Sequence, residues 1–392
     1  MLTDIPINSR LFKATILSLS LLTIMAGALV SPALANIAHA FSEEPYWKIK
    51  LVLTIPAPFI IVFALLNGKI ALIFSKKKIT LFSLILYILG GAGGGLSTTL
   101  GMLLVFRALL GISVGLLMPL ATGLIADFYS GDIRANLMGK STATSNLGGI
   151  IGTLISGFLA EIAWQASFTI YLLAVPVFIM TLIFLKDPKA PKSVNTTPLS
   201  LLKRPLLITW MFMAFLTMII FYTVPVNIAL YIEQMGFGKS SLSGVAISIL
   251  TGAGFVAGLS FSKAAKFFRH FFLSLCYFMI SAGFLLIIYS PNTFLLLTSL
   301  FVVGLGLGWA VPNIFTEAVN SVPDGYGVAA MGFITPSIYL GQFFSPIVVD
   351  FSYKLAGLND IKGPFIIVFI FSLITCVVVT LFNSKTSRKR LS

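Results

Sequence analysis

The stretch FRALLGISVGLLMP, residues 106–119, lies in a long apolar region and contains one arginine. Arg107 is the only charged residue between Lys78 and Asp127, a run of 48 positions. A guanidinium is not deprotonated in proteins, and a charge in hydrocarbon is costly. If this region lies in a membrane, Arg107 must face a water-filled cavity, find an anionic partner, or extend outward to the membrane surface.

The composition is that of a polytopic membrane protein. The 392 residues are 58% hydrophobic and only 10% charged, whereas about a quarter of the residues are charged in soluble domains. A transmembrane helix needs about 20 apolar residues. Lipid admits only helices or closed barrels, and the short alternating strands of a barrel are not found here. The sequence therefore predicts twelve transmembrane helices, at residues 13–35, 48–67, 79–98, 101–126, 136–160, 166–185, 206–232, 241–262, 271–289, 294–320, 327–350 and 364–383.

The net charge of +14 is explained by orientation in the membrane. With the N-terminus in the cytoplasm, 20 of the 26 Lys and Arg residues fall in cytoplasmic segments and five on the outer side. This is the positive-inside pattern, and it predicts that both termini are cytoplasmic. A nucleic-acid surface in the basic loop 186–204 is the weaker interpretation, so we expect no nucleic-acid partner.

A polar segment in the middle of the chain separates two similar halves. Residues 186–204, KDPKAPKSVNTTPLSLLKR, hold three prolines and five basic residues, which is typical of a linker. We expect an N-terminal six-helix bundle at 1–185, a cytoplasmic linker at 186–205, and a C-terminal six-helix bundle with a basic tail at 206–392. A shift of 193 residues places glycines and prolines of one half on those of the other: Pro32 on Pro225, Gly90 on Gly283, Gly111 on Gly304, Gly115 on Gly308, Pro119 on Pro312, Gly139 on Gly332 and Gly148 on Gly341.

The predicted fold class is an all-α membrane protein with twelve transmembrane helices in two pseudo-symmetric six-helix bundles. Duplicated bundles are a known architecture for alternating access, with a substrate site near the midplane between the halves. The alternative is a duplicated helical protein without a transport role. The spans hold no histidine cluster, paired carboxylates or nucleophile–base set, and the chain has no GxxxxGK[ST] loop. We therefore expect no enzymatic activity, no cofactor and no metal site.

The fourth span carries a motif that resembles a known family. Arg107, Gly111 and Gly115, each four residues apart, are similar to the fourth-helix signature of the major facilitator superfamily, in particular of its twelve-span bacterial efflux transporters. The two halves of six spans and the basic central loop extend the resemblance over essentially the whole chain. The resemblance implies that Arg107 faces the transport cavity and takes part in proton coupling.

Two further motifs of the family are partly kept. GKIALIFSKK, residues 68–77, keeps Gly68, Lys76 and Lys77 of the pattern after the second span, but Leu72 replaces its acid. The resemblance implies that the charge network which latches the cytoplasmic side is weakened or built differently. The loop between the fourth and fifth spans keeps two charges of that network, Asp127 and Arg134.

The antiporter signature of the fifth span corresponds to GGIIGTLISG, residues 148–157. Gly148 and Gly152 are kept, while Thr153 replaces the proline. The repeat partner in the eleventh span, GQFFSPIVVD, does have a proline, Pro346. Because this signature is associated with export, its partial loss leaves the direction of transport open. We interpret eight residues as a conformational gate: Gly68, Gly111, Gly115, Asp127, Arg134, Gly148, Gly152 and Pro346.

Acidic residues inside the spans are scarce. Glu317, near the end of the tenth span, is the best candidate for a titrating group because it continues the glycine-rich helix through Asn313. Candidates for the substrate cavity are amides, which in membrane spans often serve only as interhelical hydrogen-bonding groups: Asn146, Asn227, Asn313 and Gln342.

These features favour a secondary active transporter that exports a small organic or amphipathic molecule and is driven by protons. One alternative is a proton-coupled importer of a nutrient or metabolite; another is a membrane receptor or assembly factor that does not transport. The expected surroundings are the lipid bilayer of a bacterial cytoplasmic (inner) membrane, and the expected state is a monomer.

Overall fold

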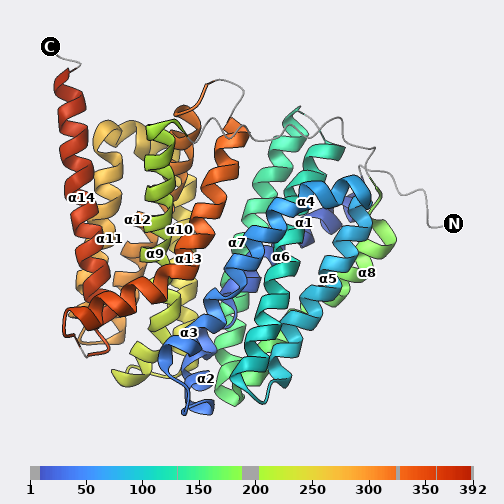
Figure 1. Ribbon diagram of the computed structural model, residues 1–392, viewed down its shortest axis with the longest axis horizontal. Coiled ribbons are helices and arrows are strands. Elements are labelled where there is room, and N and C mark those ends of the chain that lie inside the picture. Colours follow the sequence, from blue (N-terminus) through green and yellow to red (C-terminus); the bar gives the residue numbers. More distant parts are fainter. Residues whose placement is uncertain (1–8, 130, 188–202, 324–326, 359, 390–392) are drawn as a thin grey trace. The chain divides into compact units, whose positions relative to one another are not determined.

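The computed structural model describes residues 9–129, 131–187, 203–323, 327–358 and 360–389. In this part of the chain every regular element is a helix. The chain divides into two compact units, Met1–Thr196 and Thr197–Ser392, and each is described by itself. In Figure 1 the first unit runs from blue to green and the second from yellow-green to red.

The first unit has six membrane spans, several of them built from two helical pieces. Their bounds are α1 Arg10–Ala28, η1 Ser31–Ala33, α2 Leu34–Ala40, α3 Tyr46–Thr54, α4 Pro56–Ile73, α5 Lys76–Ala92, η2 Gly93–Leu96, α6 Leu100–Phe128, α7 Gly131–Ile162, η3 Trp164–Leu173 and α8 Ala174–Phe184. The η segments are 3₁₀ helices.

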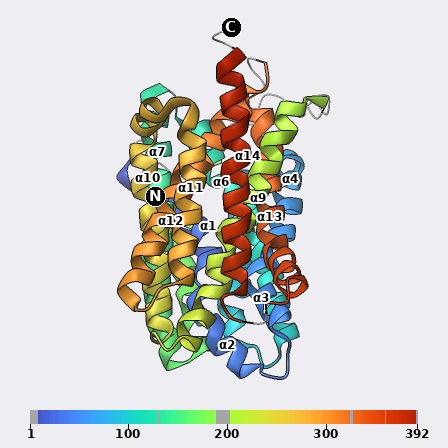
Figure 2. The same ribbon diagram turned by 90° about the vertical axis from the view of Figure 1, so that its left-hand side faces the viewer.

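Among its described residues the second unit has five apolar helices long enough to cross a membrane and a shorter one, α11, and most of them are continuous. Their bounds are α9 Pro205–Gln234, α10 Ser240–Phe268, η5 Arg269–Phe271, α11 Phe272–Ile288, α12 Thr293–Asn320, α13 Gly327–Leu355 and α14 Gly363–Lys389. Helices α11 and α14 lie side by side in both Figure 1 and Figure 2, in agreement with their extensive packing.

The predicted number of spans is confirmed within the described residues. Eleven helical segments are long and apolar enough to cross a membrane, and α11 is a shorter apolar helix at the place of the ninth predicted span. Lipid offers no hydrogen bonds to the backbone, so each span must pair its own amides, and this is why long apolar runs become helices.

The two units repeat one packing scheme. In the first, α6 packs against α4 and α5, and α1 packs against α7. In the second, α12 packs against α10 and α11, and α9 packs against α13. These are the pairs that the 193-residue offset relates, so the predicted pseudo-symmetry of the two bundles is confirmed in their internal contacts.

Proline breaks distinguish the first unit from the second. The first span is interrupted after α1 at the Ser31–Ala33 segment, which contains Pro32. The second span is interrupted between α3 and α4, where Pro56 is the first residue of α4. Proline has no N–H, so the carbonyl four residues before it, that of Val52, has no helical donor. The corresponding helices of the second unit, α9 and α10, are unbroken.

Glycines let the central helix of each unit approach its neighbour closely. A Cβ added at Gly111 would lie 2.5 Å from the Pro56 carbonyl oxygen, and one at Gly115 would lie 2.8 Å from the Ile60 carbonyl oxygen. In the second unit, Gly304 lies against Leu250, and Gly308 lies against Gly254. The repeated small residues therefore act in helix packing, as the four-residue spacing predicts.

We expect Gly111→Ala to destabilise the protein by about 1–3 kcal/mol, because the new methyl group overlaps backbone that cannot move away easily. Thermal unfolding of the purified protein measures this. Gly123→Ala on the same helix is the matched control, since a Cβ there meets nothing within 4 Å. Equal unfolding temperatures for the two variants would show that α4 and α6 are not in close contact at Gly111.

Candidate functional site

Arg107 lies in the middle of the first unit, on α6, and its side chain is 0% exposed. Its guanidinium makes three hydrogen bonds within the described residues. Nε donates to the Val52 carbonyl at 2.7 Å, and Nη2 donates to the Ala26 carbonyl at 3.2 Å. Nη1 donates to the Tyr171 hydroxyl at 2.8 Å. The cation thereby joins the first, second and sixth spans to the fourth.

Both carbonyl acceptors lie at helix ends. Val52 is in the last turn of α3, and Ala26 is in the last turn of α1. Carbonyls in a last turn lose their helical donors, and the C-terminal end of a helix carries a partial negative charge of roughly half an elementary charge. The interruptions of the first two spans therefore give the buried guanidinium a partial counter-charge without a carboxylate.

Two tyrosines complete the surroundings of Arg107. The Tyr171 hydroxyl accepts from Arg107 and donates to the Ala26 carbonyl at 3.0 Å. The Tyr87 hydroxyl donates to the Leu22 carbonyl at 2.9 Å, and its ring centroid lies 5.6 Å from that of Tyr171. Both side chains are buried, and their hydroxyl groups have backbone or guanidinium partners inside the first unit.

This arrangement differs from the three that we expected for Arg107. Its side chain is 0% exposed in this structure and is held by two backbone carbonyls and a tyrosine hydroxyl. The physical reason is that two broken helices supply acceptors inside the bundle. The role of Arg107 in proton coupling stays a prediction.

One residue of the predicted gate, Asp127, forms an ion pair with Lys76, and we call these two residues the gate pair. The Lys76 ammonium lies 2.6 Å from the Asp127 carboxylate, and both side chains are partly buried. Next to this pair, the Lys77 backbone N–H donates to the Asp187 carboxylate at 2.8 Å. A charged contact therefore forms between the start of α5 and the end of α6 although the motif has Leu72 in place of its acid. The side chain of Arg134 lies outside the described residues.

The predicted gate glycines divide into packed and open positions. A Cβ at Gly148 would meet Leu21, and one at Gly152 would meet Leu29, so α7 lies close to the first span at both. A Cβ at Gly68 would meet nothing within 4 Å. Pro346 is buried inside α13. The role of all four in a gate stays a prediction.

The four predicted cavity amides are divided between the two units, one in the first and three in the second. Asn146 is half-buried on α7 in the first unit. Asn227 is buried on α9, where its amide donates to the Thr223 carbonyl of its own helix at 2.9 Å. Gln342 is buried on α13. Of the three amides in the second unit, Asn313 is the one that lines the described pocket beside Glu317.

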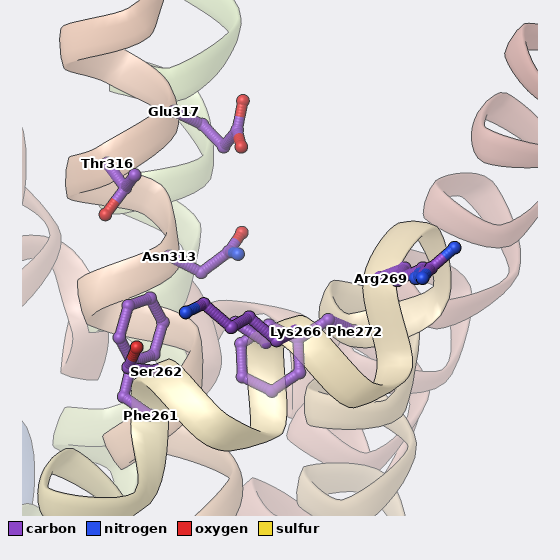
Figure 3. Close-up of a pocket in the computed structure, with 9 residues that line it drawn as sticks. Phe261, Ser262, Lys266, Arg269, Phe272, Asn313, Thr316 and Glu317 are labelled. Atoms are coloured by element: carbon purple, nitrogen blue, oxygen red, sulfur yellow. The ribbon is translucent and has the colours of Figure 1, made fainter.

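The pocket beside Glu317 lies between α10 and α12 and has a volume of about 300 Å³. Figure 3 shows Asn313, Thr316 and Glu317 on α12, and Lys266 on α10 with its amino group directed toward α12. Phe261 and Phe272 add aromatic surface. A carboxylate, an ammonium group and an amide around one small space could hold a polar group or exchange a proton.

Arg269, at the rim of this pocket, has an unusual backbone. With φ 47° and ψ −120° it ends α10, and it is the only non-glycine residue with positive φ in the described part of the chain. Such a conformation costs on the order of 1–3 kcal/mol and persists only where the surrounding packing enforces it. Its side chain extends away from Lys266 in Figure 3.

Comparison with known proteins assigns the family. The model of the Major Facilitator Superfamily matches residues 16–346. The chain therefore belongs to this superfamily, whose members are transporters and not enzymes. The resemblance seen around Arg107 is thus confirmed.

Two curated relatives are named for drug resistance. Quinolone resistance protein NorA of Staphylococcus aureus strain MRSA252 is 29% identical over 296 residues, which are 72% of this chain and 74% of NorA. Multidrug resistance protein 3 of Bacillus subtilis strain 168 is 29% identical over 119 residues, and the match covers 30% of this chain and 23% of that protein.

Solved structures share the fold at low identity. The nucleoside transporter NupG has a TM-score of 0.80 at 14% identity, with 94% of this chain and 99% of NupG covered. A bacterial homolog of the human lysosomal transporter Spinster has a TM-score of 0.77 at 13% identity and 98% coverage of both chains. A D-xylose–proton symporter has a TM-score of 0.71 at 14% identity, covering 95% of this chain and 97% of the symporter.

Exchanging the charges of the gate pair tests whether the attraction between them matters. We expect Asp127→Lys alone to lower transport several-fold by placing two cations together, and Lys76→Asp with Asp127→Lys to restore most of it. Transport by reconstituted protein measures this. A double variant no better than the single one would show that the attraction between Lys76 and Asp127, which lie 2.6 Å apart, has no role in transport.

Proposed function

We propose that this carrier exports a small organic or amphipathic molecule in exchange for protons across a bacterial inner membrane. The observation that carries the proposal is the similarity to NorA over 72% of the chain. The arginine signature of the fourth span supports it, since this signature resembles that of proton-driven exporters. Quinolones, named for that relative, are the first class of substrate to try.

The proposed cycle is alternating access by the two bundles, 1–185 and 206–392, joined by the linker 186–205. The positive-inside pattern supports an orientation with both termini in the cytoplasm. The gate pair Lys76–Asp127 would then lie on the cytoplasmic side. We propose that the protein works as a monomer, because each chain contains both halves that alternating access requires.

Import is the second candidate. The observation in its favour is Thr153, which replaces the proline of the antiporter signature in the fifth span. Its hydroxyl donates to the Gly149 carbonyl of the same helix at 2.8 Å, so the residue sits in a helix turn that a proline would interrupt. The direction of flux therefore has to be measured.

Everted membrane vesicles with an acidic interior are expected to accumulate a fluorescent fluoroquinolone if the protein exports it. Arg107→Leu is expected to abolish accumulation while the protein still inserts, and Arg107→Lys to restore part of it because the charge is kept but the planar fork of donors is lost. Accumulation in right-side-out vesicles instead would favour import. Normal transport by Arg107→Leu would remove the arginine from the mechanism.

Glu317 is the candidate for the proton-carrying residue. We expect Glu317→Gln to flatten the pH dependence of transport, because the amide cannot exchange a proton, while transport down a substrate gradient continues. Glu44→Gln is the control, since Glu44 is an exposed carboxylate paired with Lys48. An unchanged pH profile in Glu317→Gln would exclude this residue as the proton carrier.

A further inference from the structure

The carbonyl oxygen of Val52, at the interruption of the second span, is bonded by the guanidinium of the fourth span. Pro56 lacks the N–H that would bond the Val52 carbonyl in a continuous helix. Arg107 Nε donates to that same carbonyl at 2.7 Å. Both groups are buried, and a buried carbonyl without a donor is destabilising. The arginine therefore supplies the hydrogen bond that the proline removes.

The second unit lacks both partners of this arrangement. Leu250 lies against Gly304 as Pro56 lies against Gly111, and α10 is continuous there. The position that matches Arg107 after a shift of 193 residues is Leu300, a buried apolar residue. A unit with an unbroken helix has no free carbonyl at this place and carries no guanidinium. The proline and the arginine thus occur together in one half and are absent together in the other.

Tyr171 holds the guanidinium from the opposite side. It lies in η3, a 3₁₀ helix of 10 residues, which is much longer than the usual run of three or four. Its ring lies directly against Gly91, where a Cβ would overlap the ring, so the side chain has little freedom to turn. The hydroxyl bridges Arg107 and the Ala26 carbonyl, and Ala26 lies at the C-terminal end of α1.

We propose that Pro56 and Tyr171 are positioning residues for Arg107, Pro56 by leaving the Val52 carbonyl as an acceptor and Tyr171 by orienting the opposite edge of the guanidinium. The inference deepens the proposed function and rests on it only for the part Arg107 takes in transport. The structural coupling between Pro56 and Arg107 is independent of substrate and direction.

A double-variant cycle in thermal unfolding tests the coupling. Arg107→Met is expected to lower the Tm of the purified protein by about 4 °C or more, because the Val52 carbonyl loses its donor. Pro56→Ala returns a backbone N–H to that carbonyl. In the Pro56→Ala background the loss caused by Arg107→Met is expected to fall to about half or less.

Pro58→Ala is the matched control for the cycle. It lies two residues further along α4, and the N–H that it returns faces the Thr54 carbonyl, to which none of the three hydrogen bonds of Arg107 goes. The loss caused by Arg107→Met is expected to be unchanged in this background. An equal loss in all three backgrounds, or the same relief from Pro58→Ala, would overturn the proposal.

Transport assays test whether the hydrogen bonds of Arg107 to Val52 and Tyr171 matter for the function of the carrier. Arg107→Lys is expected to keep a larger fraction of fluoroquinolone transport in the Pro56→Ala background than in the wild-type background. In each background the fraction is measured against the protein with arginine. The reason is that in the Pro56→Ala background a single ammonium group needs to bond only the Ala26 carbonyl and Tyr171. Tyr171→Phe is expected to lower the Tm, because Arg107 Nη1 loses its acceptor, and to lower the maximal rate of the wild-type carrier even at temperatures well below that Tm. A Tyr171→Phe variant with a normal rate would overturn the role given to Tyr171. If neither the wild-type protein nor any variant transports the fluoroquinolone, the proposed function fails. The thermal-unfolding cycle still decides whether Pro56 and Arg107 are coupled.

Discussion

The first unit depends on a buried cation that is held without an acid. Arg107 cannot lose its proton, and its side chain has no access to solvent, so its charge must be balanced by nearby dipoles. Those dipoles come from the C-terminal ends of α1 and α3 and from the Tyr171 hydroxyl. The helix interruptions that weaken the first two spans are the same features that make the guanidinium stable in the fourth.

Much of the fold follows from the sequence because lipid leaves a chain few choices. A long apolar run must become a helix, so the twelve spans could be located from hydropathy alone. The duplication could be read from Pro32 and Pro225 and from the glycine pairs, because small residues at a fixed spacing mark close helix contacts. The packing of α6 and α12 follows this expectation in both units.

The site could be predicted only in part, because its acceptors are backbone atoms. The single charge at Arg107 identified the position, but a carbonyl has no signature in a sequence. Pro56 was the available signal, since a proline frees the carbonyl four residues earlier. Tyr171 lies in residues 164–173, WQASFTIYLL, and nothing in that stretch indicates that its hydroxyl would reach the fourth span. Lys76 and Asp127 are 51 positions apart, and their contact depends on the packing of α5 against α6.

The burial of the Arg107 guanidinium can be measured directly by NMR of protein labelled with ¹⁵N-arginine, in which the Arg107 Nε–H signal is assigned by its loss in Arg107→Lys. A guanidinium that is enclosed by the Val52 and Ala26 carbonyls and by Tyr171 predicts an Nε–H that exchanges with water far more slowly than that of the exposed Arg10. Exchange of Arg107 as fast as that of the exposed Arg10 would contradict the account, because the side chain would then stand in water.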